Sequence, residues 1–102
     1  MRRDSLPVQA AATIEALNRE RVGIEARLTA ALREWKAAES NLAPWEQVTT
    51  WADLLTMPSE SILAHQRWEM ARCLALSIQG HLRSHDELTA EVRRLLIRTL
   101  GL

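Results

Sequence analysis

The sequence has few of the residues that interrupt helices or cross-link small secreted proteins. Its 102 residues include three glycines, three prolines and one cysteine, Cys73. A single cysteine excludes an internal disulfide framework and is typical of a chain that stays in a reducing compartment. The apolar runs are all shorter than the ~20 residues that span a bilayer. We therefore expect a soluble, cytoplasmic protein.

An excess of charge of either sign is also absent. Thirteen Lys and Arg residues balance 13 Asp and Glu residues, so the formal net charge is zero. Proteins that bind nucleic acid usually carry a basic excess, because neutralising phosphates drives their affinity. The balance disfavours this class without excluding it. Lys36 is the one lysine beside twelve arginines, a bias typical of GC-rich codon usage that favours a bacterial or phage origin.

Signals for β-strands are missing too. No stretch alternates Val, Ile or Thr with polar residues, and the sequence contains neither Asn-Gly nor Asp-Gly to close a hairpin. Apolar residues instead recur every three or four positions, which is the spacing of helices. We predict an all-α fold, a single domain over residues 1–102 that forms an elongated helical bundle or hairpin of about four helices.

The first predicted helix is long and covers about residues 6–41. Ser5 suits the N-cap and Pro7 the first turn, while Gly23 costs a helix only ~1 kcal/mol. The apolar positions form a heptad seam, as in a coiled coil. The seam consists of Ile14, Arg21, Leu28, Trp35 and Leu42 on one edge and Ala10, Leu17, Ile24, Ala31 and Ala38 on the other. A helix this long exceeds a compact globule, so we expect a homodimer through the seam.

Three further helices are predicted, over about residues 44–55, 57–80 and 85–100. Pro44 and Thr56 suit the starts of the first two, and Ser84 with Glu87 has the spacing of a capping box. The sequence leaves open whether the last two helices are continuous. The expected core residues are Ile62, Leu63, Ala71, Leu74 and Ile78, with Trp68 beside them, and then Leu88, Val92, Leu95, Leu96 and Leu100.

Two of the four tryptophans, Trp45 and Trp51, lie six positions apart in a chain without Phe or Tyr. On a helix they stand roughly 120° apart, so one neighbour can hardly cover both. Either both are core, or one is exposed as an anchor, because tryptophan is enriched in binding hot spots. Trp45 is the better candidate for the anchor. We expect Trp45, Glu46, Trp51 and Arg21 to bind a partner, Arg21 because a charge in a seam often fixes pairing.

Residues 48–67 support an alternative, because they resemble a helix-turn-helix unit that binds DNA. Gln66 and Arg67 would contact the bases. Two positions depart from the motif: Thr56 stands where glycine is usual, and His65 stands where an aliphatic residue is usual.

Catalytic and metal-binding patterns are weak. His81 and His85 are four residues apart and could face one metal ion, but zinc needs three or four ligands. The simpler interpretation is a polar flank in which Cys73 is buried as a small hydrophobic residue. The helical outline resembles that of the small chorismate mutases, yet residues 44–55 contain no arginine, which that family needs there. We expect no enzyme, no cofactor and no metal.

These observations favour a non-enzymatic protein–protein interaction module. An adaptor, a chaperone-like binder or an inhibitor of a larger assembly would fit, and small neutral helical proteins of phages that block host-defence complexes offer an analogy of size and class. The alternative is a DNA-binding transcriptional regulator that uses residues 48–67.

Overall fold

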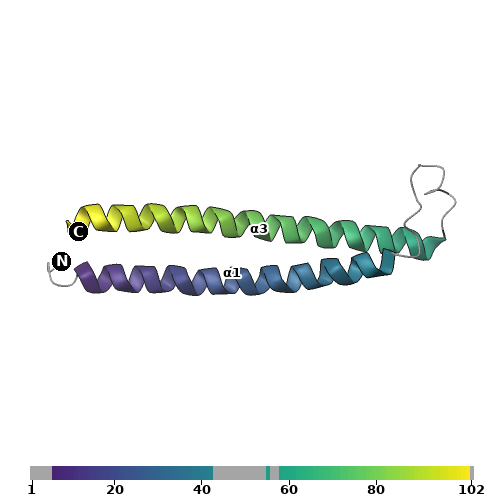
Figure 1. Cartoon of the computed structure of the whole chain (residues 1–102), viewed down its shortest axis with the longest axis horizontal. Coiled ribbons are helices and arrows are strands. Elements are labelled where there is room, and N and C mark those ends of the chain that lie inside the picture. The colour runs from purple at the N-terminus through teal and green to yellow at the C-terminus, as the bar shows by residue number, and fades with distance from the viewer. Residues whose placement is uncertain (1–5, 43–54, 56–57, 102) are drawn as a thin grey trace. The chain divides into compact units, whose positions relative to one another are not determined.

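The computed structural model describes residues 6–42, 55 and 58–101, and these residues contain helices and no strand. Helix α1 spans Leu6–Leu42 and helix α3 spans Ser59–Leu100 (Figure 1). The prediction of an all-α fold is confirmed for this part of the chain, as is the long first helix. Neither helix is long and apolar enough to cross a membrane.

The prediction of about four helices is wrong, because the described residues form two. Helix α3 runs without a break through Gly80 and past Ser84 and Glu87, where the capping-box spacing predicts a new start. The predicted helix over 44–55 lies outside the described residues, apart from Leu55, which is helical and exposed.

Local chemistry defines the two ends of α3. The carbonyl oxygen of Pro58 accepts hydrogen bonds from the backbone N–H groups of Ser61 and Ile62, at 3.0 and 3.3 Å. The Ser61 hydroxyl donates to the same oxygen at 2.8 Å. At the other end Gly101 adopts a φ of 71°, the left-handed conformation that favours glycine after a helix. Thr56, the predicted cap, lies outside the described residues.

Two compact units make up the described part of the chain. Residues within Met1–Arg27 and Gln79–Leu102 form the first unit, and residues within Leu28–Ile78 form the second unit. In each unit a stretch of α1 lies beside a stretch of α3 that runs in the opposite direction (Figure 1). The buried apolar side chains are Leu17, Ile24, Ala31 and Ala75.

The seam predicted on the first helix is the face that α1 turns inward. All ten seam positions are buried or half-buried, Arg21 among them. Within each unit α3 is the element that lies against this face. A homodimer through the seam would therefore require α1 and α3 to separate, and homodimerisation itself stays a prediction.

The inward face of α3 agrees with the prediction in part. Trp68, Ala71, Ile78, Val92 and Leu96 are half-buried as expected, but four of the expected leucines are not. Leu63, Leu74, Leu88 and Leu95, which were expected in the core, are about half exposed. In the second unit Ala64, Ala71 and Ala75 lie on the inward face, and Leu63 and Leu74 lie to one side of it. The positions that are buried or half-buried at spacings of three and four are Ser61, Ala64, Trp68, Ala71, Ala75, Ile78, Leu82, His85, Thr89, Val92 and Leu96.

Candidate protein-binding surface

Some of the residues predicted to bind a partner lie within the part of the chain that the structure describes, and others lie outside it. Trp45, Glu46 and Trp51 lie outside the described residues, and the choice between core and anchor stays a prediction. Arg21 is described, and so are Gln66 and Arg67, the alternative DNA-binding residues, which are both exposed on α3.

Arg21 is held inside the first unit by acidic side chains. Its Nε donates to Oδ1 of Asp86 at 2.7 Å and its Nη2 to Oδ2 at 3.3 Å. It also forms an ion pair with Glu25, one turn along α1. The hydrogen bond to Asp86 is the main cause that raises the pKa of Arg21 and lowers the pKa of Asp86. The Arg21 guanidinium thus links α1 to α3, and contact with another chain would compete with this link.

A second link joins the same two helices one residue away. His85 is buried, with 7% of its surface exposed, and its Nε2 lies 3.0 Å from Oε2 of Glu20 on α1. A carboxylate only accepts hydrogen bonds, so Nε2 of His85 is the donor to Glu20. The Thr89 hydroxyl donates to the His85 carbonyl oxygen at 2.9 Å and lies beside Nδ1. The two links together set the register of the helices in the first unit.

The candidate metal ligands do not gather into a site. His81 and His85 line one hollow of the first unit with Glu20, yet no group of three or more His, Cys, Asp or Glu side chains among the described residues is placed to hold a metal ion. The prediction that Cys73 is buried is wrong. Cys73 is exposed, because its position falls outside the inward row of α3, and its Sγ lies 3.6 Å from Oε1 of Glu69.

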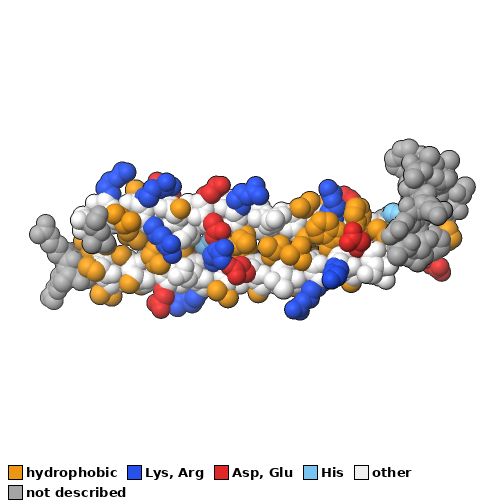
Figure 2. Space-filling view, viewed as in Figure 1, with side chains coloured by type: hydrophobic (Ala, Val, Ile, Leu, Met, Phe, Trp, Pro, Cys, Tyr) orange, Lys and Arg blue, Asp and Glu red, His pale blue; other side chains and the backbone are white. Residues whose placement is uncertain are grey.

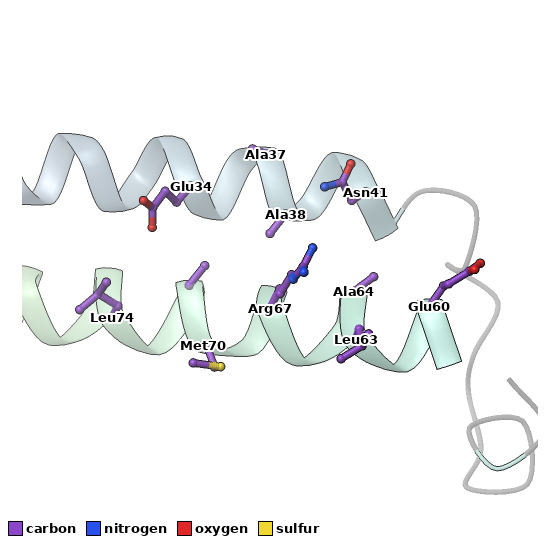
Figure 3. Close-up of a pocket in the computed structure, with 11 residues that line it drawn as sticks. Glu34, Ala37, Ala38, Asn41, Glu60, Leu63, Ala64, Arg67, Met70 and Leu74 are labelled. Carbon is purple, nitrogen blue, oxygen red and sulfur yellow. The ribbon is translucent and has the colours of Figure 1, made fainter. Parts of the chain in front are cut away.

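A groove with mainly apolar walls lies in the second unit and has a volume of about 1010 Å³. We call it the second-unit groove. Helix α1 contributes four residues between Glu34 and Asn41, and α3 contributes seven between Glu60 and Leu74 (Figure 3). The two helices bring these stretches together because they run in opposite directions within the unit.

Three bulky side chains of the groove are open to solvent. Leu63 is 51% exposed, Met70 71% and Leu74 50%. With Arg67 they form a row at spacings of four, three and four, next to the inward row of α3. Helix pairs that accept a further helix carry this pattern, an apolar stripe wider than one seam.

Charges of both signs accompany the apolar row. Figure 3 shows Arg67 extending toward Ala38 of α1, with Glu34 on the Leu74 side of it and Glu60 on the other side. Arg67 is the one basic residue among the described residues that line the groove, and Glu34 and Glu60 line it on either side along the helices. A surface that binds phosphates gathers basic residues, whereas the described residues of this groove include two glutamates and a single arginine.

Comparison with known proteins adds no family to these observations. No protein-family model, no curated protein and no solved structure matches the chain.

Proposed function

We propose that this protein is a non-enzymatic protein–protein interaction module and that it binds protein through the second-unit groove. The observation that carries the proposal is the exposed row of Leu63, Met70 and Leu74 along the groove. Complete burial of such a side chain contributes about 1.5–3 kcal/mol. Apolar patches of this kind mark interaction sites in soluble proteins.

The shape of the groove favours a helix as its occupant. Two antiparallel helices form its walls, and an amphipathic helix with apolar residues at spacings of three and four fits such walls. Met70, at the centre of the exposed row, has a flexible side chain that adapts to different contacts. Hydrophobic side chains also lie between charged ones on the visible surface of the first unit (Figure 2).

We further propose that the protein is a small bacterial or phage adaptor or inhibitor that binds a larger assembly, such as a host-defence complex. This proposal rests on the size, the neutral charge and the helical sequence. Trp45, Glu46 and Trp51 remain the residues proposed to hold that target.

The alternative, a DNA-binding regulator that uses residues 48–67, has less support. The positions that would form its turn lie outside the described residues, and the described residues that line the groove with Arg67 include two glutamates and no second basic residue. Electrophoresis with random duplex DNA at low salt separates the two functions. The regulator would retard the DNA through phosphate contacts, whereas the interaction module would leave its mobility unchanged.

A pair of matched variants tests the groove. Met70→Glu places a charge in the groove, and Val22→Glu places the same charge on α1 in the first unit, where Val22 is 66% exposed. Both should change stability by less than ~0.5 kcal/mol, because the sites are exposed. In affinity purification from nuclease-treated bacterial lysate, the Met70→Glu protein should lose a stoichiometric protein that the wild type and Val22→Glu retain. Identical retention by all three proteins, together with a monomeric wild type, would refute binding through the groove.

A further inference from the structure

We infer that the occupant of the second-unit groove is a second copy of this chain. A two-fold axis near Met70 would set Arg67 of each copy against Glu34 of the partner subunit. This inference rests on the proposed function, since it names the protein that the groove binds.

The charges of the groove supply the first argument. Among the described residues no ion pair joins Arg67 or Glu34 to another side chain. Arg67, Glu34 and Glu60 therefore line the same groove with no charged partner among the described residues, and a second copy carries the matching charge for Arg67 and for Glu34. Complementary charges of this kind select one partner and one register over others.

The order of the residues along the groove supplies the second argument. Met70 lies between Glu34 and Arg67 in the direction of the helices (Figure 3). In a two-fold interface, if residue i contacts residue j of the other copy, residue j also contacts residue i. An axis beside Met70 therefore produces two Arg67–Glu34 pairs from one arrangement and places the two Met70 side chains against each other.

The apolar row supplies the third argument. Leu63 and Leu74 flank Met70 on the same face of α3. A partner subunit related by an axis at Met70 would therefore cover all three exposed side chains. An axis chosen to pair Arg67 with Glu60 would fall beside Leu63 instead. Met70 and Leu74 would then lie away from the axis. The arrangement at Met70 brings two antiparallel helix pairs together in the manner of a four-helix bundle.

Two charge reversals, studied alone and mixed, test the inference. Arg67→Glu alone creates two acidic contacts in a homodimer, and Glu34→Arg alone creates two basic contacts. Each single variant should weaken self-association by about tenfold or more, since like charges at an interface oppose binding. The mixture restores both opposite-charge pairs across the axis. It should form a one-to-one heterodimer with an affinity near that of the wild type, seen by native mass spectrometry with one variant isotope-labelled.

The control is Glu60→Arg, which reverses a charge of the same groove away from the axis. The Glu60→Arg protein should dimerise with the same affinity as the wild type, and loss of its dimer would overturn the proposed axis. Circular dichroism establishes that every variant keeps its helices. A monomeric wild type, or a mixture of reversals that fails to pair, would overturn the inference.

The failure of the inference is distinguishable from the failure of the proposed function. If the wild type is monomeric and Met70→Glu still loses a protein from the lysate, another protein fills the groove and only the inference fails. If the wild type is monomeric and Met70→Glu changes nothing, both fail.

Discussion

Nε of Arg21 lies 2.7 Å from Oδ1 of Asp86, so a charged seam position of α1 is tied to α3 in the first unit. The seam tolerates arginine because the guanidinium reaches its edge, where the two side chains are 43% and 45% exposed. A charge enclosed by the seam would lose its hydration, and no ion pair would offset that cost.

Acid should remove the contribution of this pair to stability. The hydrogen bond to Arg21 lowers the pKa of Asp86 from its ordinary value of 3.8, so the unfolded chain takes up the proton more readily than the folded protein does. The stabilisation is therefore complete above pH ~4 and is lost as the pH falls through the lower, folded pKa. The difference in melting temperature between the wild type and Asp86→Asn should shrink over that range at low salt. A difference that is independent of pH would contradict this role.

The buried histidine of the first unit should matter more than its carboxylate partner. His85→Ala removes a buried ring, and we expect a loss of about 1–3 kcal/mol in the free energy of unfolding. Glu20→Gln keeps an oxygen that can accept the hydrogen bond from Nε2, and Glu20 is 63% exposed. Its loss should be below ~1 kcal/mol. Urea unfolding measures both changes in the free energy of unfolding, provided that its slope against urea concentration is the same for each variant. Equal losses in the two variants would contradict this difference in burial.

Trp68 should tolerate replacement by phenylalanine. Its indole Nε1 is buried and has no hydrogen-bond partner among the described residues, a state that costs roughly 1–3 kcal/mol. Phenylalanine fills most of the same space without the donor, so Trp68→Phe should keep or raise the melting temperature. Trp68→Ala leaves a cavity and should lower it. A large loss in the phenylalanine variant would mean that the indole N–H has an acceptor.

Gly80 should be a site of simple stabilisation. A Cβ atom added there meets nothing within 4 Å, and alanine is favoured over glycine inside a helix by about 0.5–1 kcal/mol. Gly80→Ala should therefore unfold at a higher urea concentration. Gly101→Ala is the contrast, since its φ of 71° disfavours a side chain and no gain is expected.

The long first helix could be predicted from the sequence because its signal is repeated. The seam positions recur at spacings of three and four from Ala10 to Leu42, and one interior glycine does not outweigh that pattern. For α3 the same kind of evidence was misleading. Gly80 and the spacing of Ser84 and Glu87 are local signals for an end and a start. The inward row instead continues through Ile78, Leu82 and His85, and its packing outweighs a cost of ~1 kcal/mol for glycine.

The candidate surface was harder to predict. The sequence predicted Leu63 and Leu74 in the core together with Ala71, whereas the structure exposes the two leucines and places Ala64 with Ala71 in the inward row. The exposed row could have been found from the spacing of Leu63, Arg67, Met70 and Leu74. Its position beside Glu34 depends on how α1 and α3 align within the second unit, and the sequence holds no local signal for that alignment.

The most direct measurement of the central claim places a photoreactive phenylalanine analogue at position 70 and, in a separate protein, at position 22. Each protein is irradiated in bacteria, and the cross-linked products are identified by mass. Binding through the groove predicts a protein adduct of defined mass at position 70 and no such adduct at position 22. No adduct at position 70, or the same products from both positions, would contradict binding through the groove.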